Sequence, residues 1–210
     1  MAKINIPPFN LSGKLGDYVY YKWKGKNVVR KRPAPRKTEP SPAELKLRSK
    51  FSFISKFLVP LKSILNASFK SNEMSGMNRA ISANFNHVIP ESYPDWRIDF
   101  GKLLLGQGDL SGFSELSVTV DVPGHLKFIW NGRSRRKFAA SHDRVYVAVY
   151  CEHLSQWLIR LGSVYRKNGS LILNAEPFSG FPVHVYLGLI SDSWGGGSDS
   201  QYLGSYDLTK

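Results

Sequence analysis

Cysteine is almost absent from this 210-residue sequence, in which Cys151 is the only one. One thiol cannot form an internal disulfide, and it leaves too few ligands for a cysteine-based metal site. We therefore expect Cys151 to be a small buried hydrophobic residue. The sequence also has no run of about 18 apolar residues and no apolar stretch of the signal-peptide kind near its start. We expect no membrane span, and a location in the cytoplasm or in a particle assembled there.

Catalytic motifs are missing as well. The five histidines include no His-x-x-x-His pair, and neither a Gly-x-Ser-x-Gly motif nor a phosphate-binding loop is present. His184 alternates with two valines, which predicts a solvent-facing strand residue rather than a base. Asp95 and Asp99 are interpreted as surface acids. These absences predict a protein that is not an enzyme and that binds no metal and no cofactor, although a missing motif does not exclude every activity.

Acidic residues are scarce in the first third of the chain. Residues 1–70 contain 16 Lys and Arg but only Asp17, Glu39 and Glu44, whereas residues 71–210 contain 13 basic and 13 acidic groups. The net charge of +13 therefore belongs entirely to the first third. Such a charge favours a polyanionic partner, meaning nucleic acid, anionic lipid or an acidic protein surface. The alternative is a basic surface that only keeps the protein soluble.

The densest mixture of cationic and aromatic residues lies in residues 17–37. Two β-rich runs flank Gly25-Lys26, a Gly-first pair of the kind found in type II′ turns, so we predict a β-hairpin with Trp23 opposite Val28. Neither face is purely apolar, and a two-stranded ribbon is marginal in water, so the hairpin needs a partner. The residues predicted to contact a polyanion are Lys22, Lys24, Lys26, Arg30, Lys31, Arg32, Arg36 and Lys37, with Tyr20, Tyr21 and Trp23 as rings that stack or pack beside them.

The hairpin is flanked by two extended pieces. Pro7-Pro8 excludes helix from residues 1–12, which we interpret as an extended arm. Three prolines in residues 33–40 predict a semi-rigid spacer. The predicted N-terminal part therefore comprises residues 1–40.

A helix is expected directly after the spacer. Ser41-Pro42-Ala43-Glu44 has the pattern of a capping box with proline at the first helical position, and Pro60 predicts a kink or two helices in series. A second short helix is expected over residues 75–87. The apolar seam of the first helix consists of Leu47, Phe51, Ile54, Leu58, Leu61 and Leu65. This seam packs on its own domain or docks on a second subunit, in which case Leu47, Phe51, Ile54 and Leu58 form the interface.

The rest of the chain has the pattern of an all-β domain. Residues 93–105 predict a turn followed by a strand, and the loop at residues 106–109 is the expected boundary between a helical part, 41–108, and a β-domain, 109–210. Seven short strands separated by turn sequences predict a fibronectin-like β-sandwich with Trp130 and Tyr186 as core rings. The predicted strands are 116–122, 125–130, 144–151, 156–164, 170–173, 183–191 and 201–206.

Two loops of this β-domain carry further candidates. Arg133-Ser134-Arg135-Arg136-Lys137 extends a basic surface or is simply a solvated loop. Trp194, in a glycine-rich loop, is a candidate interface anchor, although a ring folded over the end of the sandwich explains it equally well.

Short motifs along the chain resemble a family of Bacteroidota proteins that is catalogued only as a domain of unknown function. In the first third these motifs are Gly13-Lys14-Leu15-Gly16, Tyr20-Tyr21, Gly25-Lys26, Val29-Arg30 and Ser41-Pro42 leading to Arg48 and Phe51. Farther along they are Asn78-Arg79-Ala80, Tyr93-Pro94 with Ile98-Asp99, Asp143 with Val145 and Val147, Val183-His184-Val185-Tyr186 and Ser200-Gln201-Tyr202-Leu203. The resemblance covers nearly the whole chain and implies no catalytic residues. The opening motif is also similar to one in some phage-encoded proteins, which favours a role in assembly.

Two functions follow as hypotheses. In the first, the sandwich is a rigid body, and the arm, hairpin and helix dock on copies of the chain or on a protein partner, for example by addition to a sheet edge. In the second, the cations neutralise phosphates of DNA or RNA while the rings stack on bases or pack against sugars. A component of a particle can also hold nucleic acid, so the two are compatible, and we prefer the first.

Overall fold

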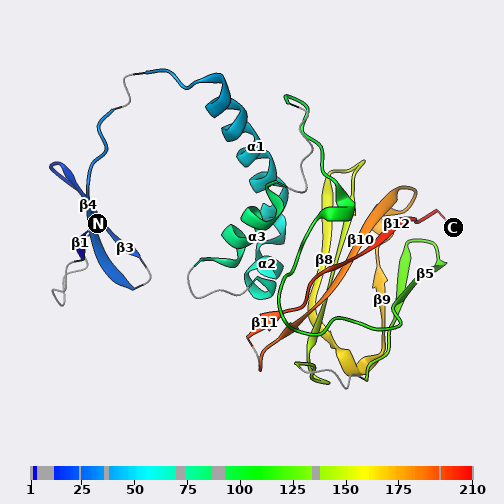
Figure 1. The fold of residues 1–210 in the computed structure, drawn as a ribbon. Coiled ribbons are helices and arrows are strands. Elements are labelled where there is room, and N and C mark those ends of the chain that lie inside the picture. The colour runs from blue at the N-terminus through cyan, green and yellow to red at the C-terminus, as the bar shows by residue number, and fades with distance from the viewer. Residues whose placement is uncertain are drawn as a thin grey trace. The chain divides into compact units, whose positions relative to one another are not determined.

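The computed structural model describes residues 2–3, 12–23, 25–35, 38–69, 74–86, 93–133, 138–193 and 195–209. It divides into two compact units, Met1–Ser41 and Pro42–Lys210, with the break at the end of the proline-rich spacer (Figure 1). Each unit is described by itself.

The first unit contains an antiparallel sheet in place of the expected two-stranded ribbon. Its strand order is β1-β4-β3-β2. The predicted hairpin is formed by β3 (Tyr18–Trp23) and β4 (Lys26–Lys31), and β2 (Gly13–Leu15) and β1 (Ala2–Lys3) pair with its two edges. The remaining arm residues, 1 and 4–11, lie outside the described residues. Four strands give this unit, here called the N-terminal sheet, more hydrogen-bonded support than a hairpin has alone.

The predicted turn at Gly25-Lys26 is wrong. Trp23 pairs with Lys26 and Tyr21 with Val28, so Lys26 belongs to β4 and not to the turn. Gly25 directly before it has a φ of +77°, a left-handed conformation that glycine adopts without strain. The pairing differs from the predicted one by two residues. Because side chains alternate with period two, a shift of two residues leaves the division of side chains between the two faces unchanged.

The helical layer of the second unit begins with α1 (Pro42–Leu58), directly after Ser41 as predicted. The expected break at Pro60 is confirmed by a 3-10 turn, η1 (Val59–Leu61), which leads into α2 (Lys62–Ser68). The second predicted helix is α3 (Gly76–Asn84), whose first turn is capped by the Ser75 hydroxyl, which accepts a hydrogen bond from the Asn78 amide at 3.3 Å. None of the described helices is both long and apolar enough to cross a membrane.

Two antiparallel sheets form the sandwich. One contains β5 (Ser117–Val122), β6 (His125–Ile129) and β9 (Ser170–Asn174) in the order β5-β6-β9. The other has the order β11-β10-β7-β8, with β12 also paired to β10. Its strands are β7 (Arg144–Cys151), β8 (Gln156–Tyr165), β10 (Pro182–Ser191), β11 (Gly196–Gly197) and β12 (Gln201–Asp207). All seven predicted strands are present, and the fibronectin type III-like sandwich is confirmed.

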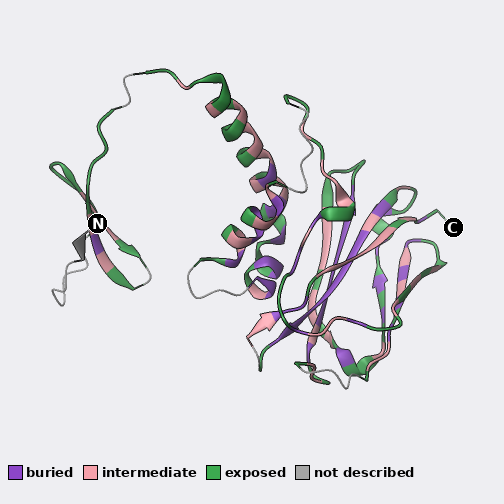
Figure 2. Cartoon of the chain, in the orientation of Figure 1, coloured by how far each residue is buried: buried purple, intermediate pink, exposed green. Residues whose placement is uncertain are grey.

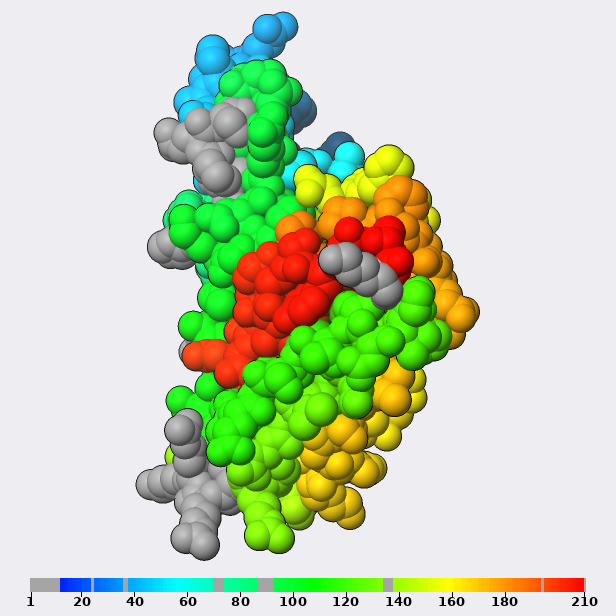
Figure 3. Space-filling model, turned by 90° about the vertical axis from the view of Figure 1, so that its right-hand side faces the viewer, coloured from blue at the N-terminus to red at the C-terminus, as the bar shows by residue number. Residues whose placement is uncertain are grey.

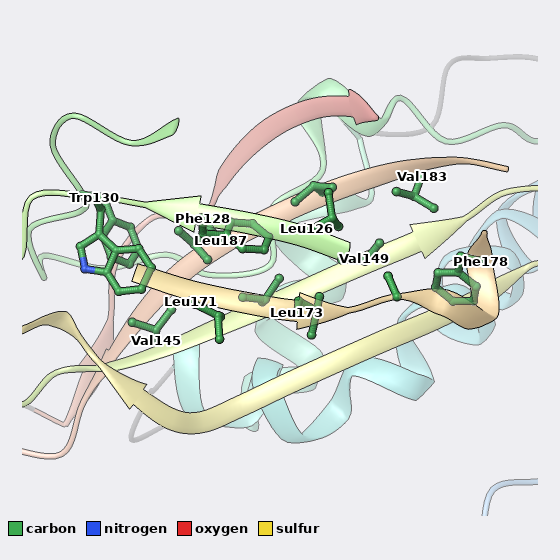
Figure 4. Packing of buried hydrophobic residues seen from close by; sticks show 14 of the residues in the cluster. Leu126, Phe128, Trp130, Val145, Val149, Leu171, Leu173, Phe178, Val183 and Leu187 are labelled. Atoms are coloured by element: carbon green, nitrogen blue, oxygen red, sulfur yellow. The ribbon is translucent and has the colours of Figure 1, made fainter. Parts of the chain in front are cut away.

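The sandwich core is filled by residues from both sheets, as Figure 4 shows. Trp130 and Phe128 belong to it together with Val149 and Leu187, all buried. The Trp130 indole N–H donates to the Arg166 carbonyl at 2.7 Å, so its one polar atom is satisfied. Cys151 is fully buried in the same cluster, as predicted.

The opposite face of β7 and β10 is covered as well. Tyr146, Ala148, Tyr186 and Ile190 are buried there in a second apolar cluster with residues of the helical layer. Tyr186 is therefore a core ring, but of this outer layer and not of the sandwich interior as predicted. The expected boundary at residues 106–109 falls inside this unit, because the helices and the sandwich share a core.

Residues 93–113, here called the crossing segment, do not form the strand expected within 93–105. Among its described residues the only helical or strand element is a 3-10 turn, η2 (Phe100–Lys102). The segment crosses the outer layer, where the Tyr186 hydroxyl donates to the Phe100 carbonyl at 2.7 Å. The Leu104 amide and carbonyl bond the Asn84 side chain, each at 2.8 Å, in place of a strand ladder. In Figure 3 the green residues of this part of the chain border the red C-terminal strand.

Candidate functional site

The N-terminal sheet distributes its cations over two faces. The strand pairing places Lys14 opposite Val19 and Val19 opposite Arg30, and it places Trp23 opposite Lys26. We call the face that carries these residues the cationic face, and its members are Lys14, Val19, Tyr21, Trp23, Lys26, Val28 and Arg30. The other, mixed face carries Leu15, Tyr18, Tyr20, Lys22, Asn27, Val29 and Lys31.

The predicted cations that the structure describes are exposed. Their side chains have no ion pair within the described part of the chain. They are Lys22, Lys26, Arg30, Lys31 and Arg32. Lys24, Arg36 and Lys37, also predicted to bind a polyanion, lie outside the described residues. The exposed group of cations is therefore available to an anionic partner.

Aromatic rings lie beside these cations. The Trp23 side chain is 54% exposed, and Tyr20 and Tyr21 are half-buried. The Arg30 guanidinium lies 5.8 Å from the centroid of the Tyr21 ring, within cation–π range. Val28, between Tyr21 and β1, is buried. This face combines charge with flat apolar surface, the combination that a nucleic acid or an acidic protein surface with apolar groups can use.

Sequence reasoning missed the contribution of β2. Lys14 extends the cationic face and Leu15 extends the mixed face, where Tyr18 opposite it is 50% exposed. A signal was available, because Gly16-Asp17 forms a two-residue connection between β2 and β3, and Gly16 has a φ of +55°. A turn pair of this kind between β-prone residues predicts a second hairpin.

The predicted interface on α1 is split by the fold. Ile54 and Leu58 are fully buried in the core shared with the sandwich, so they belong to the interior of their own unit. Leu47 and Phe51 are 57% and 52% exposed. Trp194, the other predicted interface residue, lies outside the described residues. The basic loop is described only up to Arg133, which is exposed.

His184 is not the solvent-facing residue predicted from its alternation with valines. Its ring stacks on Phe100 of the crossing segment, with the centroids 3.8 Å apart, and its Nδ1 lies 2.9 Å from the Tyr202 hydroxyl. Burial lowers the pKa of His184, although the nearby Glu152 carboxylate acts in the opposite direction. The sequence missed this environment because the covering segment is far away in the chain.

The surroundings of the His184 ring are largely aromatic. In the part of the chain that the structure describes, no three His, Cys, Asp or Glu side chains lie close enough together to hold a metal ion. Asp99 pairs with Lys102 at 2.9 Å on the surface, and this contact lowers the pKa of the Asp99 carboxyl. We interpret the His184 contacts as packing that holds the crossing segment.

The one buried ion pair among the described residues connects separate segments of the second unit. Arg166 and Asp143 are 2% and 0% exposed, and Nη2 of Arg166 lies 3.1 Å from Oδ2 of Asp143. The guanidinium also donates to the Ser111 and Gly112 carbonyls. The pair thus joins the crossing segment to the loops that precede β7 and follow β8.

The comparison with protein families gives a match over nearly the whole chain. The profile described as "Family of unknown function (DUF6266)" matches residues 10–204. The chain belongs to the DUF6266 family. The matched residues include β2 to β4 of the N-terminal sheet and nearly all of the sandwich, in agreement with the resemblance to a domain of unknown function. No curated protein matches the chain.

Solved structures similar to this chain include isolated fibronectin type III domains. The domain of human collagen alpha-1(XX) has 14% sequence identity and a TM-score of 0.36, and the match covers 49% of this chain and 89% of that domain. A domain of human contactin 1 has 12% identity and a TM-score of 0.35, covering 49% of this chain and 82% of that one. The fold is assigned from the strand order of this chain itself.

Proposed function

We propose that this chain is a non-enzymatic structural or assembly protein. Its N-terminal sheet and first helix dock on copies of the same chain or on a protein partner, and the sandwich is a rigid body that carries them. The observation that supports this most is the N-terminal sheet itself, where exposed cations without ion pairs lie beside exposed rings. Fibronectin type III-like folds often serve protein interaction, which agrees with this role.

The edge of the sheet offers a mechanism. All three residues of β2 are exposed, and no further described strand pairs with its outer side. An extended segment of a partner can add to such an edge through main-chain hydrogen bonds, while the cations select an acidic sequence. The resemblance to phage-encoded proteins that we infer from the opening motif also favours assembly. We place the protein in the cytoplasm of a member of the Bacteroidota, or in a particle assembled there.

Light scattering after size exclusion tests the self-assembly form of the proposal. We expect a mass above the 23.7 kDa of one chain that rises with concentration. Arg30→Glu should lower this mass, while the matched reversal Lys62→Glu, at an exposed position on α2, should not. A chain that stays monomeric at high concentration and recruits no acidic protein contradicts the proposal.

Nucleic-acid binding is the second candidate. It is favoured by the Arg30 and Tyr21 contact beside the exposed Trp23, because phosphate neutralisation and base stacking would then occur on one face. The absorbance ratio of the purified chain before and after nuclease, with its mass measured in the same run, separates this candidate from the first. Carried nucleic acid favours binding, and a mass that survives nuclease favours assembly.

A further inference from the structure

The apolar seam of α1 is only half covered. Ile54 and Leu58 are fully buried, whereas Leu47 and Phe51, two turns and one turn before Ile54 on the same stripe, are 57% and 52% exposed. Figure 2 shows the change along the helix, with green in its first turns and purple in its last. The helix therefore continues an apolar face beyond the core that covers its second half.

The uncovered stretch forms one wall of a groove. Its lining includes Leu47 and Phe51 of α1, Ile81 of α3, and Phe85 and Met74 at the two ends of α3, around a hollow of about 760 Å³. We call this the helical groove. It is concave and mostly apolar, with Arg48, Asn78, Ser82 and Asn86 as its polar lining, and it lies between two helices, which is the shape that accepts a third helix.

The flank of α1 beside the groove is held in place. The Trp96 indole N–H donates to the Ser49 hydroxyl at 2.9 Å, and the Lys50 ammonium lies 4.9 Å from the centroid of the Phe85 ring. These contacts fix the first turns of α1 while leaving Leu47 and Phe51 open. A partner would therefore meet a preformed surface, which reduces the entropic cost of binding.

The charge around the helical groove selects among partners. Arg48 lines it, and no described carboxylate does. The described helical layer carries Lys46, Arg48, Lys50, Lys56, Lys62 and Arg79 against Glu44 alone. The α1 helix of a second copy would bring like charges together, which disfavours pairing of this surface with itself.

We propose that the helical groove binds an amphipathic helix with an acidic polar face, supplied by a partner protein. This inference rests on the proposed interaction role and names the partner chemistry for the first helix. Two apolar side chains of the partner, three or four residues apart, would contact Leu47 and Phe51. Carboxylates flanking them would approach Arg48.

Two designed peptides serve as probes for the full chain. Both are fluorescein-labelled 18-residue amphipathic helices with identical Leu and Phe anchors, and one has a Glu-rich polar face while the other has a Lys-rich one. Fluorescence anisotropy is measured at physiological salt, and contacts between the acidic peptide and the N-terminal sheet are controlled by repeating the titration with the Arg30→Glu variant. We expect the Glu-rich peptide to bind at least about ten-fold tighter than the Lys-rich one.

Variants locate the binding site. Phe51→Ala should weaken binding of the Glu-rich peptide roughly ten-fold or more, because it removes a central anchor. Leu45→Ala is the matched control, because Leu45 is 48% exposed on the same helix but does not line the groove. Arg48→Glu should reverse the peptide preference, and Lys56→Glu, the same charge change outside the groove, should not.

The outcomes separate this inference from the proposed function. Equal binding to the Phe51→Ala and Leu45→Ala variants, no preference between the peptides, or no binding at all overturns the helical groove as a docking site. If the light-scattering result holds in that case, only the partner named here is wrong. If the peptide result holds and the chain neither associates nor recruits acidic protein through its N-terminal sheet, the role of that sheet is wrong instead.

Discussion

The two faces of the N-terminal sheet make a quantitative prediction about nucleic-acid binding. The perturbation is a matched pair of neutralising changes, Arg30→Gln and Lys31→Gln. These residues are neighbours in β4 but lie on the cationic and mixed faces respectively. If duplex DNA binds the cationic face, Arg30→Gln should reduce the dependence of affinity on salt, and Lys31→Gln should leave it nearly unchanged.

The magnitude follows from the number of cations on each face. Among the cations whose side chains the structure describes, the cationic face has three, Lys14, Lys26 and Arg30, and the mixed face has two, Lys22 and Lys31. With one phosphate neutralised per cation, the affinity for B-DNA between 50 and 200 mM salt should fall about 40-fold for the cationic face alone. If both faces contact phosphates, the fall should be about 500-fold. Each lost phosphate contact lowers the slope of log K against log salt by about 0.9.

Anisotropy of a labelled 20-base-pair duplex, titrated at several salt concentrations, measures this slope. The control is Lys62→Gln, which removes the same charge from an exposed position on α2. A slope near zero, or equal losses of slope for Arg30→Gln, Lys31→Gln and Lys62→Gln, would refute the assignment of DNA binding to one face. The first result excludes phosphate contacts, and the second indicates attraction by net charge alone.

Three further predictions concern the second unit. Arg166→Met leaves the buried Asp143 carboxylate without its cation, so the free energy of unfolding in urea should fall by about 3–5 kcal/mol, and adding Asp143→Leu should restore most of it. A Cβ at Gly188 would lie 2.6 Å from Cε1 of Tyr146, so Gly188→Ala should lower that free energy by about 1–3 kcal/mol. Because the pKa of His184 is lowered from 6.5, the folded state favours the neutral ring, and stability should decline as the pH falls below that value, a decline that His184→Gln should reduce.

Each of these three predictions has a control or a contradicting outcome. Lys127→Met breaks an exposed ion pair with Asp121 and should leave the free energy of unfolding nearly unchanged, so an equally small loss in Arg166→Met would contradict the role of burial. Ala at Gly196 meets no atom within 4 Å, and a similar loss there would mean that the Gly188 effect is not steric. If the chain is equally stable above and below the pH at which a free histidine ionises, His184 does not favour its neutral form.

Local patterns were sufficient for most elements of the fold. The seven strands of the sandwich, the helix start after Ser41 and the break at Pro60 depend on alternation, turn residues, capping and the missing amide of proline. Each of these acts over a few residues, so it can be seen in the linear chain. The accumulation of positive charge in the first third is also a property of the chain alone.

The errors share a different physical origin. His184 was assigned to solvent from its alternation with valines, and Tyr186 was assigned to the sandwich core. Both faces of β10 are covered, one by the other sheet and one by the helical layer with the crossing segment. The expected strand within 93–105 is missing because Asn84, on α3, takes the Leu104 hydrogen bonds that a ladder would use. The predicted hairpin register paired Trp23 with Val28, whereas the structure pairs Trp23 with Lys26. The local sequence patterns that favour these two registers are nearly equivalent.

The amino-acid order alone decided that the first third would attract anions and that one stripe of α1 would be apolar, because charge and side-chain polarity do not depend on folding. Tertiary structure decided which members of these sets meet a partner. Strand pairing placed Lys14 of β2 on the same face as Arg30, and packing buried Ile54 and Leu58 while leaving Leu47 and Phe51 open. These outcomes depend on contacts between segments far apart in the chain, which no local pattern specifies.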